Sequence, residues 1–132
     1  MTRYLELADY LLIAEAVLEI PAERLARLER ISLAESALLA PAAEFEGTEA
    51  YPDLVAKAAA LCWHLVKNHP LPDGNKRAAF LALRVFLDRN DAVWHRSPDD
   101  PAETDSVIRG VAAGTVSQAS LADWIRTRLA PE

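Results

Sequence analysis

The 132-residue sequence lacks the features that define several common classes of protein. Its only cysteine is Cys62, so neither an intrachain disulfide nor a zinc site built from cysteines can form. No apolar run approaches the roughly 18 residues that a membrane span needs. Acidic residues interrupt the N-terminal segment early, which is not typical of a signal peptide. These absences predict a cytoplasmic protein with no membrane association.

The sequence also lacks an excess of basic residues. Its formal net charge is −6, which argues against direct binding of nucleic acid and makes a helix-turn-helix DNA reader the least favoured class. The positive charge is nevertheless concentrated in one segment. Between His64 and Asn90 the chain carries five lysines and arginines against two acidic residues. This distribution favours a local site for an anionic ligand in an otherwise acidic protein.

Strand signals are weak, because β-branched clusters and alternating patterns are few while helix-forming residues abound. We therefore predict one all-α domain, residues 1–132, a compact bundle of about six helices. The helices are expected at about residues 6–18, 22–40, 52–68, 75–89, 102–113 and 118–129, and the second could break at Ser32. Loops are expected at 41–51 and 95–101. The helix at 75–89 is apolar nearly all round, which predicts a central position.

Residues 69–78, His-Pro-Leu-Pro-Asp-Gly-Asn-Lys-Arg-Ala, connect the third and fourth predicted helices. An imidazole in general titrates near neutral pH, so the side chain of His69 is a candidate to take a proton from a hydroxyl nucleophile. Asp73 could hold Mg²⁺, which usually takes one or two carboxylates together with phosphate oxygens. Because Pro, Asp-Gly and Asn are also ordinary turn residues, composition alone leaves a plain connecting turn equally open.

The second half of the segment suits an anion. Gly74 allows the backbone to approach a phosphate, and Asn75 could bind phosphate oxygens near the first N–H groups of the helix. Lys76 offers a point charge, and Arg77 a planar fork for bidentate contact. Together these groups suit phosphoryl or nucleotidyl transfer, where catalysis is mostly positioning and charge neutralisation.

The spacing of six residues in this segment resembles the motif of the Doc (death-on-curing) toxins, a branch of the Fic fold. These residues are His69, Asp73, Gly74, Asn75, Lys76 and Arg77. The resemblance extends over about residues 4–128 and includes Gly47–Pro52 and the tail around Val111–Trp124. It implies that His69 is the catalytic base and that Asp73 places Mg²⁺. It also implies that Gly74 and Asn75 form an anion nest, with Lys76 and Arg77 on the phosphates of ATP.

Two positions bear on which group is transferred. Fic enzymes that transfer AMP carry Gly where Lys76 stands and a second Arg where Phe80 stands. The resemblance therefore implies a Doc-type protein kinase that transfers the γ-phosphate of ATP to elongation factor Tu and arrests translation. AMP transfer and a catalytically inactive Fic-fold binding module remain as alternatives. A separate Phd-like antitoxin is the implied partner.

The sequence departs from the motif at Leu71, where an aromatic residue is usual, and at Ala78, where Thr is common. We expect Leu71 to fill most of the same space in the core, whereas Ala78 removes a hydroxyl near the phosphate end. His64 is expected to lie away from His69 around the helix axis. Phe45 and its loop could add a strand to an extended target segment or could form an ordinary connection.

Overall fold

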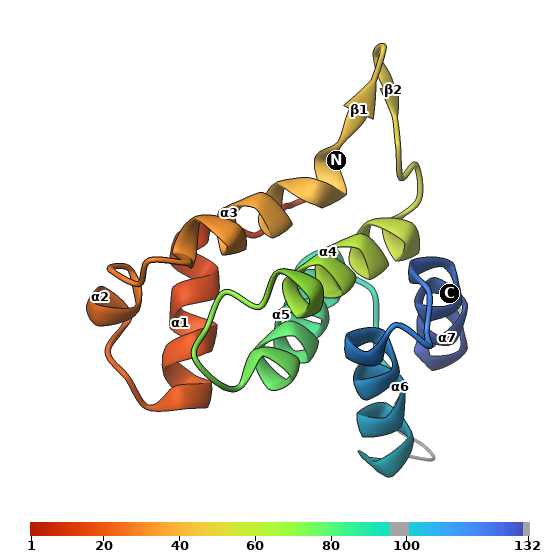
Figure 1. Ribbon diagram of the computed structural model, residues 1–132. Helices are drawn as coiled ribbons and strands as arrows, with labels where there is room; N and C mark the ends of the chain where they lie inside the picture. The colour runs from red at the N-terminus through yellow and green to blue at the C-terminus, as the bar shows by residue number, and fades with distance from the viewer. Residues whose placement is uncertain (96–100, 131–132) are drawn as a thin grey trace.

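The computed structural model describes residues 1–95 and 101–130, and it confirms a mostly α-helical fold (Figure 1). The described elements are seven α-helices, one short 3-10 helix and one two-stranded hairpin. In chain order they are α1 (Leu7–Leu18), α2 (Ala22–Leu25), α3 (Ile31–Leu39), η1 (Ala40–Ala42), β1 (Glu44–Phe45), β2 (Thr48–Glu49), α4 (Leu54–Asn68), α5 (Asn75–Arg89), α6 (Pro101–Ala113) and α7 (Gln118–Arg128).

Helices α4 and α5 occupy the middle of the molecule, between α1–α3 on one side and α6–α7 on the other (Figure 1). The helix predicted to be central, α5, shares that position with α4, which contacts more elements, namely α3, η1, α5, α6 and α7. Three consecutive alanines, Ala58–Ala60, are fully buried and let neighbouring helices approach the α4 backbone closely. The apolar face of α5 then packs on α4, α1 and α6.

The predicted helix at 22–40 is two helices rather than one. Helix α2 ends after one turn, and α3 begins at Ile31 with Arg30 at its N-cap, so Ser32 does not cap it. Between α2 and α3 the backbone forms hydrogen bonds between residues that are three apart in sequence. For example, the Leu28 N–H donates to the Leu25 carbonyl at 3.1 Å. This break allows the Arg30 side chain to reach the end of α4.

The loop predicted at 41–51 contains a short antiparallel hairpin. Glu44 pairs with Glu49, and Phe45 pairs with Thr48. The two turn residues, Glu46 and Gly47, both have positive φ, as the favoured two-residue hairpin turns require. Because Glu replaces the usual Asn or Asp and each strand has two residues, the sequence carried almost no hairpin signal.

The C-terminal helices begin and end close to the predicted residues. Helix α6 is followed by Gly114 at a φ of 84°, and Ser117 caps α7 by accepting the Ser120 N–H at 3.0 Å. The predicted loop at 95–101 lies mostly outside the described residues. In the described part of the chain no helix is both long enough and apolar enough to cross a membrane.

Candidate functional site

The backbone at His69 is held from α3. His69 is the C-cap of α4 and lies in the left-handed region, with φ 51° and ψ 55°. Arg30 donates from Nε to the His69 carbonyl at 3.1 Å and from Nη2 to the Asn68 carbonyl at 2.9 Å. The Asn68 amide in turn donates to the Leu33 carbonyl at 2.9 Å. The two bonds from Arg30 satisfy carbonyls at the C-terminal end of α4, which lack partners inside that helix, and together with the Asn68 bond they fix the residue that carries the imidazole.

The loop after His69 is closed by the side chain of Asn75. Its Oδ1 accepts the Leu71 N–H at 2.9 Å, and its Nδ2 donates to the Leu71 carbonyl at 2.9 Å. Asn75 is 5% exposed and Leu71 is 2% exposed, so water cannot replace these bonds. The side chain of Asn75 therefore shapes the loop, and both of its polar atoms are engaged by the backbone of Leu71.

Gly74 is the N-cap of α5, with φ 71°, and α5 begins without a side-chain cap. A Cβ at Gly74 would lie 3.0 Å from Leu18 Cδ2 and 3.0 Å from Val17 Cγ1, so glycine lets the turn pack against α1. The first intrahelical bond runs from the Ala78 N–H to the Gly74 carbonyl at 2.9 Å. The preceding N–H groups of the first turn are therefore available to an anion, and the helix dipole favours one there.

The charged side chains of the motif are exposed. His69, Asp73, Lys76 and Arg77 all face solvent. Among residues 1–95 and 101–130, none of these four side chains makes a hydrogen bond or an ion pair within the protein. The loop and the first turn of α5 thus bring together all six predicted site residues, with their cationic, basic and carboxylate groups free for a ligand.

Asp73 is the only carboxylate among residues 69–78. No group of three or more His, Cys, Asp or Glu residues that could hold a metal occurs in the described ranges. A single exposed carboxylate beside an anion site fits Mg²⁺ that shares its coordination with phosphate oxygens and water, rather than a cage made by the protein alone.

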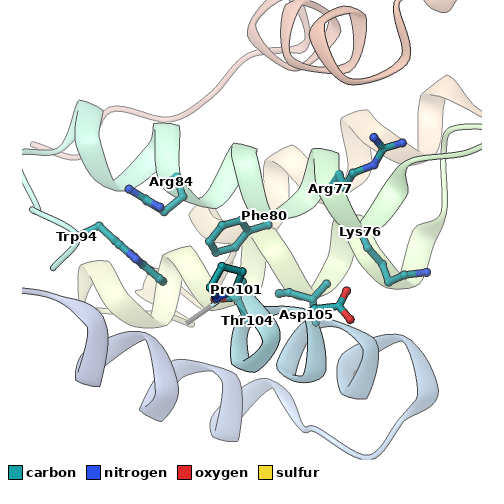
Figure 2. Close-up of a pocket in the computed structure, with 9 residues that line it drawn as sticks. Lys76, Arg77, Phe80, Arg84, Trp94, Pro101, Thr104 and Asp105 are labelled. Carbon is teal, nitrogen blue, oxygen red and sulfur yellow. The ribbon is translucent and has the colours of Figure 1, made fainter. Parts of the chain in front are cut away.

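A pocket of about 310 Å³ adjoins the cationic end of the motif. Lys76 and Arg77 line one end, Phe80 and Arg84 lie further along α5, and Trp94 lies beside Arg84 in the segment after α5 (Figure 2). The loop therefore does not stand alone on the surface but continues into a concave region.

The sequence of this chain is similar to those of known proteins. The model of the Fic/DOC family matches residues 4–87, which is more than half of the chain. The chain belongs to the Fic/DOC family. A curated relative, named Toxin Doc, from Mycolicibacterium smegmatis (strain ATCC 700084 / mc(2)155), is 48% identical over 58 residues. That alignment covers 44% of this chain and 45% of the relative, so less than half of either chain is matched.

The structure also shows the surroundings of the two departures from the motif and of two residues on the preceding helix. Leu71 is buried, as expected for a residue that fills the space of an aromatic one. Ala78 is fully buried against the core. His64 contacts the Ala60 carbonyl of its own helix through Nδ1 at 2.8 Å, which confirms that it does not pair with His69. Cys62 is fully buried, and burial raises the pKa of its thiol to about 12, so it is not a nucleophile at neutral pH.

Two positioning residues of the Fic/DOC domain escaped the sequence-based prediction. One is Arg30, whose role depends on a helix break that periodicity does not reveal. The other is Lys57, which is 2% exposed in α4 and donates to Glu49 Oε1 at 3.0 Å and to the Tyr51 carbonyl. A lysine within an apolar helical run is the signal that could have identified it, because a buried ammonium requires partners.

Proposed function

We propose that this protein is the toxin of a toxin–antitoxin pair and a Doc-type protein kinase that uses ATP. The observation that supports the proposal best is the uncapped start of α5. There Gly74 turns the chain, Lys76 and Arg77 face solvent, and the exposed imidazole of His69 lies at the other end of the same short loop. An anion site beside a base suits transfer of a phosphoryl group to a hydroxyl.

In the proposed reaction the γ-phosphate of ATP lies against the first-turn N–H groups of α5, with Lys76 and Arg77 on its oxygens. His69 takes the proton of the target hydroxyl as that oxygen bonds to the γ-phosphorus. The bond from the γ-phosphorus to the bridging oxygen breaks, and ADP leaves. Mg²⁺ held by Asp73 and the phosphates would neutralise part of the negative charge during this transfer.

The proposed target rests on the family resemblance alone, and the proposed partner rests on that resemblance and on the toxin name of the matched relative. We propose elongation factor Tu as the phosphorylated protein and a Phd-like antitoxin as the chain that controls the activity. Both place the protein in the cytoplasm, where ATP and the translation machinery are found. Phosphorylation of this factor would arrest translation and therefore growth.

Transfer of AMP is the alternative reaction of the same site. The presence of Lys76 and Phe80, in place of a glycine and a second arginine, supports phosphorylation over AMP transfer. Incubation of purified protein with ATP, Mg²⁺ and elongation factor Tu, followed by mass spectrometry, separates the two. A mass increase of one phosphate is expected, and an increase of one AMP unit would contradict the kinase proposal.

Expression without a partner tests the catalytic role of His69. We expect the parent chain to arrest growth and His69→Ala to abolish the arrest, because loss of a general base typically costs about 10²- to 10⁴-fold in rate. His64→Ala is the matched control, since His64 bonds only to its own helix, and it should remain toxic. A toxic His69→Ala protein would refute the catalytic proposal. A protein that binds no ATP in calorimetry would be a binding module instead.

A further inference from the structure

The pocket between α5 and α6 has a different character at each of its two ends. Lys76 and Arg77 stand at the end next to the motif loop, whereas Phe80, Arg84 and Trp94 form the other end (Figure 2). Its volume of about 310 Å³ falls at the lower limit of the range common for small-molecule sites. A ligand that is anionic at one end and planar at the other would match this arrangement.

The spacing of the side chains along α5 sets the length of such a ligand. Lys76, Phe80 and Arg84 are four residues apart, so they lie on one face of the helix. At 1.5 Å per residue, the backbone positions of Lys76 and Arg84 are roughly 12 Å apart. That span suits an extended nucleotide whose phosphates bind at the start of α5.

The far end of the pocket presents planar groups. The rings of Phe80 and Trp94 meet edge to face, with their centroids 5.6 Å apart. The Arg84 guanidinium lies 4.7 Å from the Trp94 centroid and 5.8 Å from the Phe80 centroid. Nucleobases stack on aromatic rings and on guanidinium planes, and such stacking tolerates any base.

The α6 side of the pocket carries polar groups between these ends. Thr104 and Asp105 both line it. Asp105 uses Oδ2 for an ion pair with Arg109 at 2.7 Å, which leaves Oδ1 able to accept a hydrogen bond. A carboxylate repels phosphate but accepts from a hydroxyl, so this side suits a ribose better than a phosphate chain.

We propose that this pocket binds the nucleoside part of the nucleotide, with the base stacked on Phe80, Arg84 and Trp94. The proposal rests on the proposed function, because it takes the phosphates to lie at Lys76 and Arg77. The nucleotide then runs along α5, away from the motif loop, with its terminal phosphate nearest to His69. Since stacking is tolerant of base identity, ATP and GTP should bind with similar affinity.

Calorimetry with ATP and with inorganic tripolyphosphate, each with Mg²⁺, tests this assignment. Phe80→Leu keeps an apolar side chain and removes the ring, and Arg84→Ala removes the guanidinium. Each should weaken ATP binding by about 5- to 100-fold and leave tripolyphosphate binding unchanged. Leu81→Ala is the matched control, because Leu81 is an exposed neighbour on α5 that does not line the pocket, and its ATP affinity should equal that of the parent.

A second measurement on the parent chain keeps the test decisive if a variant fails to fold. In ¹⁵N-labelled protein, ATP should shift the indole N–H resonance of Trp94, whereas tripolyphosphate should not, and the resonance of Trp63 should stay in place with both. If ATP binds but Trp94 does not respond and both variants bind normally, the pocket assignment is overturned and the proposed function stands. If neither ATP nor tripolyphosphate binds, the proposed function itself fails.

Discussion

The two ends of α4 are held in opposite ways. At its C-terminus the motif loop is fixed by buried bonds from Asn75, by Arg30 and by contact of Gly74 with α1. At its N-terminus the hairpin projects from the helices (Figure 1), and Lys57 is the buried side chain that ties it down. Phe45 on the hairpin is 76% exposed.

If the hairpin docks a protein target, this difference separates the demands of chemistry from those of docking. A base and an anion site must keep their geometry, so the loop that carries them is bonded on several sides. A strand that pairs with another chain must keep its edge open, and the hairpin does. Helix α4 has 15 residues and is roughly 22 Å long, with the hairpin before its start and the motif loop after its end, so a docking contact of the hairpin would be remote from the reacting group.

The largest effect is expected when the amide of the motif loop is removed. Asn75→Ala leaves the N–H and carbonyl of buried Leu71 without partners, which should lower the free energy of unfolding by roughly 2–4 kcal/mol. Asn90 is a control, because its amide makes the same pair of bonds to the backbone of exposed Arg3, where water can replace them, together with one bond to the Phe86 carbonyl at 2.8 Å. Urea unfolding should show a much smaller loss for Asn90→Ala, and equal losses would contradict the role assigned to burial.

A pair of glycines tests the contact between the motif loop and α1. Gly47 in the hairpin and Gly74 in the loop both have positive φ, so alanine at either site costs about 1 kcal/mol. An added Cβ meets nothing within 4 Å at Gly47, but at Gly74 it lies 3.0 Å from Val17 and Leu18. Gly74→Ala should therefore be roughly 1–3 kcal/mol more destabilising in thermal or urea unfolding. Equal losses of stability in Gly47→Ala and Gly74→Ala would mean that α1 moves to accommodate the added Cβ at no cost in free energy.

These residues also show where prediction from the sequence succeeds. The motif loop between two helices and the start of α5 near Asn75 were predicted, because hydrophobic periodicity and turn residues act locally. The burial of Leu71 was expected from the family resemblance rather than from periodicity. The inward orientation of the Asn75 side chain was not predicted, because a side-chain amide next to a glycine can form hydrogen bonds equally well with a ligand or with the backbone of its own loop. Arg30 acts across 39 residues of sequence, and no local pattern reports such a contact.

The hairpin should respond to loss of its buried anchor. Lys57→Met keeps the length of the side chain and removes the charge, while Glu49, whose side chain is half exposed, can return to water. The fold should persist and the hairpin amides should exchange faster with solvent. If the hairpin docks the protein target, the KM for that target should rise about tenfold, equivalent to about 1.4 kcal/mol, with kcat unchanged. A fall in kcat at constant KM would contradict a docking role.

Glu44→Gln is the control for that variant and should act in the opposite direction. Glu44 lies directly opposite Glu49 in the hairpin, and like charges in that position are destabilising. Removal of one charge should therefore slow hydrogen exchange of the hairpin amides slightly. Faster exchange in Glu44→Gln would show that repulsion between Glu44 and Glu49 does not destabilise the hairpin, and that the ion pair of Lys57 with Glu49 does not act by reducing such repulsion.

The smallest effect is expected at the far end of α5, where exposed charges replace buried bonds. Arg89 donates to Asp9 of α1, and this hydrogen bond, with one from the Glu6 backbone, lowers the pKa of the Asp9 carboxyl below its usual 3.8. A carboxyl whose pKa is lower in the folded state stabilises the fold above its unfolded pKa. That contribution is lost as the pH falls below 3.8 and through the folded pKa.

Asp9→Asn keeps the acceptor for the Glu6 N–H and removes the charge. It should cost less than about 1 kcal/mol near neutral pH, because the pair is partly exposed and screened. The difference from the parent should vanish in acid, as urea unfolding across a pH series would show. Asp88→Asn, at an exposed position on α5, should show no such convergence. A loss that persists unchanged in acid would mean that Asp9 supports α1 by packing or capping, and that this end of α5 is fixed as firmly as the motif end.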